Sequence, residues 1–172
     1  MIDQTANLLG ALALAVSDKI HESARDIVRH SGETPAALIV IGYGTGPSND
    51  QLKRTLGLSH PGTVRLVDRL VADGMVERRT GQDRRAVALY LTEKGMTVRE
   101  DVLAGRLAAV RPFVEALKKP ERETLRDTLH ALLSALDPSD AERRTLCRMC
   151  DGRVCTNCPI PADFRKEAQE PS

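Results

Sequence analysis

The spacing of apolar residues along the chain predicts a mainly helical protein. Apolar side chains recur every three or four positions over residues 5–30, which is the repeat of an amphipathic helix. Two long helices are predicted in the second half, one running from Thr92 to Lys118 and one starting after Pro120 and ending before Pro138. The chain beyond Pro138 is polar apart from its cluster of cysteines.

The first part of the middle section is predicted to hold two short helices. Thr34 and Pro35 have the order of an N-cap and a first helical residue, and an apolar segment follows them as far as Tyr43. Ser48 and Gln51 have the spacing of a capping box, which predicts a second short helix.

The next segment changes its hydrophobic repeat. A helix is predicted from Ser59 to Gly74, and its inward stripe is formed by Val64, Val67, Leu70 and Val71. The repeat then falls from about 3.6 to about 2 residues, which predicts two strands, over residues 75–79 and 86–91, joined by a turn. Helix, turn, helix and hairpin in this order predict a winged helix–turn–helix.

The predicted fold class is therefore mainly α with a small β-hairpin wing, that is, a winged helix–turn–helix plus a helical dimerisation domain. We assign residues 1–33 and 93–138 to the dimerisation domain, 34–92 to the DNA-binding domain and 139–172 to a C-terminal cysteine-containing tail. The apolar stripes of the flanking helices are wider than a small winged domain can cover, and a homodimer would bury them. A monomeric helical bundle is the alternative.

The winged segment supplies candidate DNA-binding residues. The major groove admits one α-helix, whose exposed N-terminal end can contact base edges, and free N–H groups at helix N-termini attract phosphate. Arginines at a hairpin turn can enter a narrow minor groove. Base-edge contacts are assigned to Ser59, His60, Thr63 and Arg65, phosphate contacts to Ser48 and Gln51, and minor-groove contacts to Arg84 and Arg85. The Pro61–Gly62 pair either lets the backbone approach DNA closely or loosens the start of the helix.

The positive charge expected of a DNA-binding site is found in the winged segment but not in the chain as a whole. The whole chain has 25 Lys and Arg against 24 Asp and Glu, a net charge of +1, so it is not a globally basic nucleic-acid binder. Residues 48–95, however, hold nine basic against six acidic residues. Aromatic residues make up 2% of the chain, which argues against a platform of stacked rings. The less specific interpretation is a helical protein whose hairpin arginines are simply solvated.

Four short motifs in this segment resemble the MarR family of bacterial transcription regulators. They are Leu66–Leu70, Asp73–Arg79, Asp83–Arg85 and Leu91–Gly95, and they follow one another in the family's order and spacing. The resemblance extends over about residues 5–137. It implies an obligate homodimer that binds a pseudo-palindromic duplex DNA site.

The resemblance also implies roles for single residues. It places the recognition helix over residues 59–73 and a wing-tip arginine at Arg84 or Arg85, with Asp83 bracing the wing by hydrogen bonding. Together with the candidates above, the expected DNA-binding set is Ser48, Gln51, Ser59, His60, Pro61, Gly62, Thr63, Arg65, Arg69, Asp83, Arg84 and Arg85.

The tail carries all four cysteines of the chain, in two C-x-x-C pairs. They are Cys147, Cys150, Cys155 and Cys158. Four thiolates suit tetrahedral zinc, which is the favoured cofactor, or an iron–sulfur cluster. A proline directly after the last cysteine also occurs in the cluster-binding loops of ferredoxins. A thiol redox switch that forms disulfides without a metal, and chemically inert cysteines, are the remaining alternatives. The tail lies beyond the segment that resembles the family.

These patterns predict a cytoplasmic DNA-binding transcriptional regulator, with repression favoured, and not an enzyme. No βαβ pattern surrounds the C-x-x-C pairs, which argues against a thiol oxidoreductase. The apolar run near the N-terminus is too short to span a bilayer, so no membrane partner is expected. The signal that controls the regulator is expected to be a small molecule, or the metal or redox state of the cysteines. Two alternatives stay open: a regulator answering a small aliphatic ligand with a structural zinc tail, and a metal-binding interaction module without DNA activity.

Overall fold

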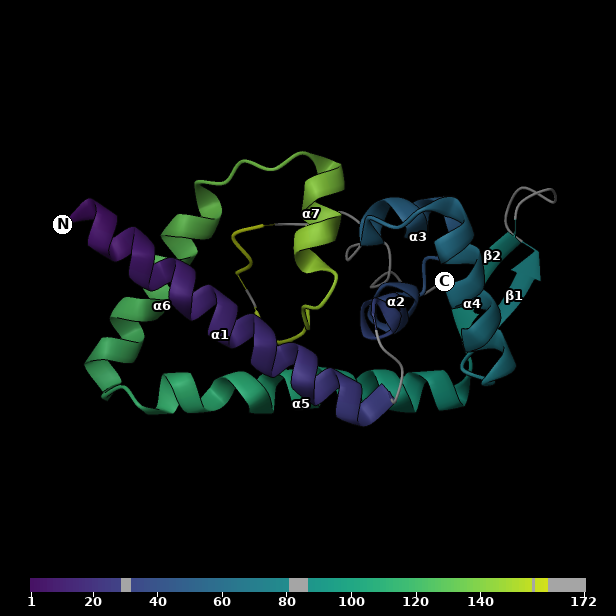
Figure 1. The fold of residues 1–172 in the computed structure, drawn as a ribbon, viewed down its shortest axis with the longest axis horizontal. Coiled ribbons are helices and arrows are strands. Elements are labelled where there is room, and N and C mark those ends of the chain that lie inside the picture. The colour runs from purple at the N-terminus through teal and green to yellow at the C-terminus, as the bar shows by residue number, and fades with distance from the viewer. Residues whose placement is uncertain (29–31, 81–86, 156, 161–172) are drawn as a thin grey trace.

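The computed structural model describes residues 1–28, 32–80, 87–155 and 157–160. The described elements, in chain order, are α1 (Ile2–Val28), α2 (Thr34–Ile41), α3 (Asn49–Leu56), α4 (His60–Ala72), β1 (Val76–Thr80), β2 (Val87–Leu91), α5 (Glu93–Glu115), α6 (Lys119–Ser134) and α7 (Asp140–Cys147) (Figure 1). The fold is thus mainly helical with one two-stranded antiparallel sheet, as the sequence predicts.

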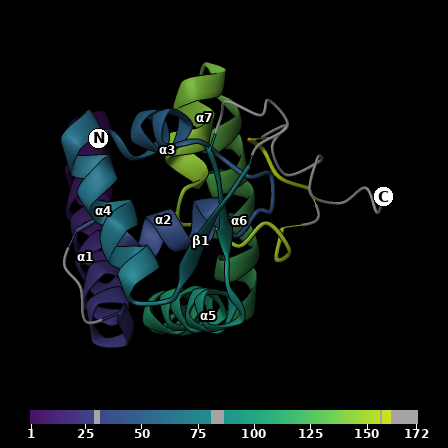
Figure 2. The same cartoon turned by 90° about the vertical axis from the view of Figure 1, so that its right-hand side faces the viewer.

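The long helix α5 connects the two ends of the molecule. Helix α1 packs along α5, and α2 packs against both helices in the middle of the structure (Figure 1). Helices α3 and α4 and the hairpin gather at the N-terminal end of α5, whereas α6 extends from its C-terminal end. Figure 2 shows the same arrangement along α5, with α7 beside α3.

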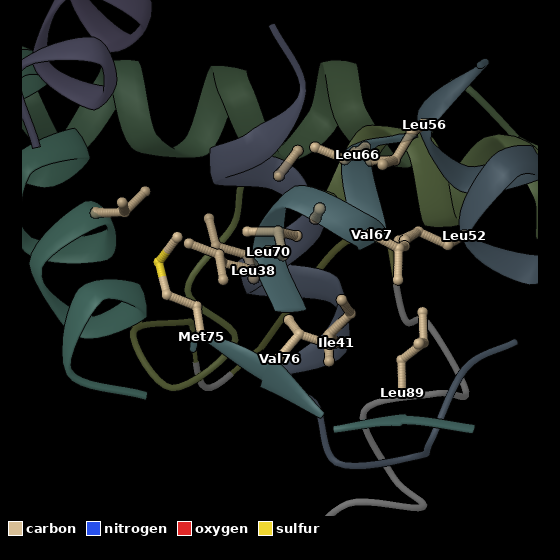
Figure 3. Packing of buried hydrophobic residues seen from close by; sticks show 14 of the residues in the cluster. Leu38, Ile41, Leu52, Leu56, Leu66, Val67, Leu70, Met75, Val76 and Leu89 are labelled. Carbon is tan, nitrogen blue, oxygen red and sulfur yellow. The ribbon is translucent and has the colours of Figure 1, made fainter. Parts of the chain in front are cut away.

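An aliphatic core lies within the winged segment. It joins side chains of α2, α3, α4 and the hairpin, among them Leu38, Ile41, Leu52, Leu56, Leu66, Val67, Leu70, Met75, Val76 and Leu89 (Figure 3). Val102 and Leu103 of α5 belong to the same cluster. Their participation fixes the middle of the long helix against the winged domain, so that a displacement of the helix also shifts the domain.

The hairpin is joined by a main-chain hydrogen bond to the segment before α3. Its two strands pair from Val76 opposite Leu91 to Thr80 opposite Val87. The Leu89 amide also donates to the carbonyl of Pro47, 3.1 Å away, which joins the hairpin to the segment before α3. These bonds set the direction in which the wing leaves the helix pair.

Several element boundaries differ slightly from the sequence-based expectations. Helix α2 begins at Thr34 itself, and Glu33 occupies the N-cap position that we predicted for Thr34. Strand β1 begins and ends one residue later than predicted. The main omission is α7, which lies in the tail where no helix was predicted; Ser139 and Glu142 form the capping box at its start.

Two helices leave much of their apolar surface exposed. Helix α1 buries only Ala24 and Val28, and α6 buries none of its described residues. Their exposed leucines are Leu8, Leu9, Leu12, Leu14, Leu129, Leu132 and Leu133, to which Leu136, just after α6, adds another. Within the described part of the chain, no helix has both the length and the apolar character needed to cross a membrane.

Candidate nucleic-acid interface

Helices α3 and α4 form a helix–turn–helix whose ends are defined by local sequence. The Ser48 hydroxyl accepts a hydrogen bond from the Gln51 amide, and the Gln51 side chain accepts one from the Ser48 amide, which completes the predicted capping box. Gly57 ends α3 in a left-handed conformation with φ of 66°, which glycine adopts without strain. The chain then turns directly into α4, whose N-cap is Ser59.

The N-terminal part of α4 presents polar side chains to solvent. Ser59, His60 and Pro61 are exposed at its start, and Arg65 and Arg69 are exposed further along. Residues four positions apart lie on the same side of a helix, so the two arginines form one positive strip. This strip has the position expected of side chains that contact base edges or phosphates.

Thr63 does not belong to this exposed surface, and our prediction that it lies off the apolar face is wrong. Its side chain is 0% exposed, and its hydroxyl donates to the Ser59 carbonyl at 3.1 Å. The buried face of α4 consists of Thr63, Leu66, Val67 and Leu70, so it is rotated relative to the predicted stripe. A threonine can occupy such a position because the preceding helical turn satisfies its hydroxyl.

Three other candidates have local structural roles at the helix starts. The Ser59 hydroxyl accepts from the Gly62 amide at 3.2 Å, which caps α4. Ser48 and Gln51 use side-chain oxygens for their mutual cap, as described above. The structure therefore explains these residue types by helix capping, and any phosphate contact would use their remaining hydrogen-bonding groups.

The tip of the wing, including Asp83, Arg84 and Arg85, lies outside the described residues. Strand β1 adds two arginines that were not among the predicted DNA-binding residues. Arg78 pairs with Asp68 of α4, and Arg79 lies over the Tyr90 ring with 4.7 Å between its guanidinium carbon and the ring centroid. Their signal in the sequence was the pair of adjacent arginines on a short predicted strand.

Charges around α3 are partly neutralised. Asp50 pairs with Lys53 at 3.1 Å and with Arg54 at 3.0 Å. The hydrogen bond from Lys53, followed by the charges of Lys53 and Arg54, lowers the pKa of Asp50 below its usual value. Asp50 is therefore ionised and offsets part of the positive charge of Lys53 and Arg54, whereas Arg65 and Arg69 are exposed on α4.

The four cysteines occupy different environments after α7. Cys147 is buried against Ile160, and Cys158 packs on the same small cluster, with its sulfur 3.2 Å from the Ile160 carbonyl. Cys150 is half-buried and Cys155 is exposed. Among the described residues, no three His, Cys, Asp or Glu side chains are arranged to hold a metal ion. The donor types fit zinc, but the four sulfurs are not brought together in this structure, so coordination would require this segment to rearrange.

The paired helices, the exposed strip on α4 and the adjoining hairpin define a winged helix–turn–helix protein. The model of the MarR family matches residues 33–86, which include both helices and the first strand of the hairpin. The chain is also 29% identical over 143 residues to the transcriptional repressor MprA of Escherichia coli strain K12, covering 78% of this chain and 80% of MprA.

Solved structures show the same fold. RV1404 from Mycobacterium tuberculosis superposes with a TM-score of 0.68 at 24% identity, covering 80% of this chain and 96% of that one. A mutant of MepR from S. aureus, bound to an oligodeoxyribonucleotide, superposes with a TM-score of 0.59 at 18% identity, covering 77% and 98%. Together the comparisons show that this chain is similar to MarR family regulators and shares their winged helix–turn–helix fold. Proteins of this family are transcriptional regulators and not enzymes.

Proposed function

We propose that this protein is a DNA-binding transcriptional repressor that acts as a homodimer on a pseudo-palindromic duplex site in the bacterial cytoplasm. The observation that carries the proposal is the exposed start of α4, with Arg65 and Arg69 on one side of a helix held by a well-capped helix–turn–helix. The related repressor MprA and the DNA-bound MepR structure favour the same function.

The exposed leucines of α1 and α6 support the dimer. Leu8 is 61% exposed and Leu132 is 47% exposed, although both lie on amphipathic helices. Several exposed leucines on one helix are uncommon on a monomer and are covered when a second copy packs against them. A symmetric dimer would place two recognition helices on one face, which matches the symmetry of a palindromic site.

We also propose that the four cysteines set the activity of the repressor through their metal or redox state, with zinc as the favoured ligand. Cys147, Cys150, Cys155 and Cys158 are the only thiols in the sequence, and they lie within one short segment. An iron–sulfur cluster or a pair of disulfides would use the same residues. The spacing of the two C-x-x-C pairs is the observation that supports this part of the proposal.

Substitution of the two exposed arginines of α4 tests the DNA-binding function. We expect Arg65→Ala and Arg69→Ala each to lower affinity for the upstream region of the protein's own gene by roughly 5- to 150-fold, the usual loss for an arginine that contacts DNA. Fluorescence anisotropy at a stated salt concentration measures this loss. Arg126→Ala is the matched control, because Arg126 is an exposed arginine on α6 that pairs only locally with Asp127. Absence of binding by the unaltered protein at low salt would contradict the proposal.

Removal of the wing-tip arginines tests the wing separately. We expect the double variant Arg84→Ala, Arg85→Ala to bind DNA more weakly and to show a shallower dependence of affinity on salt. The slope should fall by about 1 for each phosphate that the variant no longer neutralises. A salt titration of the double variant beside the unaltered protein measures both effects. An unchanged affinity and slope would remove the wing from the interface.

A further inference from the structure

The segment that follows α7 is attached to the end of α2. We call this segment, residues 148–153, the strap. The hydroxyl of the buried Tyr43, just after α2, donates to the main-chain carbonyl of Cys150 at 3.0 Å. Met149 packs on the aliphatic core of the winged segment. Two consecutive residues of the strap therefore meet buried groups, so its position is set by packing as well as by charge.

The strap also places a nearly buried acid beside α5. The Asp151 side chain is 9% exposed and pairs with Arg153 at 2.9 Å, and Arg153 reaches Glu100 of α5 at 2.7 Å. The hydrogen bond from Arg153, with a smaller contribution from the charge of Arg99, lowers the pKa of Asp151. Arg99 in turn lies over the Tyr43 ring, with 5.7 Å between its guanidinium carbon and the ring centroid. The ionised carboxylate of Asp151 is thus held by positive groups of the strap and of α5.

Two further contacts hold the chain at the start of the strap. Thr145, in the last turn of α7, donates its hydroxyl to the carbonyl of Thr55 at 3.2 Å. That carbonyl lies in the last turn of α3, where carbonyl groups have no partner within their own helix. Arg148 pairs with Glu33, just before α2, at 3.7 Å. The strap and the end of α7 therefore connect α2, α3 and α5.

We propose that the docked strap holds the winged domain in a fixed orientation on α5, and that release of the strap weakens DNA binding. Helix α3 packs against α4, so a strap that fixes α3 also fixes the recognition helix. A palindromic site requires two recognition helices at a set separation. A winged domain that moves on α5 holds α4 in the required place for only part of the time, which lowers the apparent affinity in proportion. The statement about DNA rests on the proposed function, whereas the docking of the strap does not.

The contacts of the strap allow it to detach while the domain stays folded. Its ion pairs are partly exposed, with the side chain of Arg153 59% and that of Arg148 33% exposed, and exposed ion pairs are individually weak. Val154, which follows the strap, is 57% exposed and buries little apolar surface. Detachment would uncover Met149 but leave the rest of the aliphatic core packed. Such local opening requires less free energy than global unfolding.

Reversal of the Asp151 charge tests the docking. A lysine at this position would face Arg153 and lie near Arg99 where water has little access, which strongly disfavours the docked strap. Amide hydrogen exchange of the full-length chain, measured by mass spectrometry over the strap, should become about tenfold faster or more. Asp127→Lys is the matched control. It makes the same change in net charge at an exposed position on α6, where Asp127 pairs with its neighbour Arg126.

A milder variant, Tyr43→Phe, keeps the ring in the core and removes the hydroxyl that bonds to Cys150. We expect its strap to exchange about threefold to tenfold faster than that of the unaltered protein, the usual effect of one hydrogen bond. Circular dichroism checks the helical content of each variant. If Asp151→Lys loses helical content, Tyr43→Phe decides, and it must show faster exchange together with weaker DNA binding.

The second measurement is DNA affinity, by fluorescence anisotropy at one salt concentration with the upstream region of the protein's own gene. We expect Asp151→Lys to bind about fivefold more weakly or worse than Asp127→Lys, within the usual range of allosteric coupling, although both variants gain the same positive charge. Unchanged exchange of the strap in Asp151→Lys and Tyr43→Phe would overturn the docking. Equal or tighter DNA binding by Asp151→Lys would overturn the link to DNA. If the strap detaches as expected but no form of the protein binds DNA, the proposed function fails and the docking stands.

Discussion

Replacing Gly95 with alanine is expected to destabilise the winged domain strongly. Gly95 is buried in the first turn of α5, and a Cβ atom there would overlap the carbonyl oxygen of Met75 and lie 2.9 Å from its carbonyl carbon. That carbonyl accepts a hydrogen bond from the Thr92 amide at 3.1 Å, and Thr92 caps α5 by accepting from the Gly95 amide at 3.1 Å. The methyl group therefore meets backbone that cannot move without breaking the junction between hairpin and helix.

The expected loss for Gly95→Ala is about 3 kcal/mol of the free energy of unfolding, at the upper end for an overpacked site because the contacted atoms are backbone. Urea denaturation followed by circular dichroism measures it. Gly10→Ala is the matched control, since a Cβ at Gly10 meets nothing within 4 Å. Gly10 lies inside α1, where alanine favours helix by about 1 kcal/mol over glycine. Equal unfolding midpoints for the two variants would show that the junction tolerates the methyl group.

The importance of Gly95 illustrates what sequence patterns can and cannot provide. Leu91–Gly95 was one of the motifs that resemble the MarR family, and Thr92 was predicted as the N-cap of the long helix. The reason for the glycine was not predictable, because Met75 is far from it along the chain. Local rules identified the cap, whereas only tertiary packing shows that the space beside it is filled.

Thr63, in the predicted DNA-binding surface, is a second residue whose environment depends on tertiary packing and not on local sequence. Hydrophobicity alone assigned the inward stripe of α4 to Val64 and Val71, and it counted a threonine as exposed. In the fold, packing against α2 and α3 selects a face that contains Thr63, whose hydroxyl bonds to its own helix. The existence and order of the elements followed from periodicity, but the rotation of one helix depended on its neighbours.

The tail was the least predictable part of the fold. Ser139 and Glu142 have the spacing of a capping box, yet so few apolar residues follow that no helix was predicted. Helix α7 is held instead by its contact with α3 and by the bond between Thr145 and Thr55. The sequence could indicate the chemistry of the cysteines, but it could not place them against the helix–turn–helix.

Introducing a charge on the exposed face of α6 is expected to separate the proposed dimer and remove most DNA binding. Leu129 and Leu132 are 44% and 47% exposed, and α6 buries no described residue within the single chain. Aspartate at both positions should therefore leave the fold of one chain intact while adding unpaired charge to the surface where a second copy would pack. Circular dichroism should show an unchanged helical content, and sedimentation velocity should show a monomer.

A monomer binds only one half of a palindromic site, so the double variant Leu129→Asp, Leu132→Asp should lose about 100-fold or more in DNA affinity, the usual contribution of a linked second contact. Leu146→Asp is the matched control, because Leu146 is 43% exposed but lies on α7, away from α1 and α6. It should remain dimeric and keep its DNA affinity. A double variant that stays dimeric would place the interface elsewhere, and a monomer with full affinity would show that one recognition helix is sufficient.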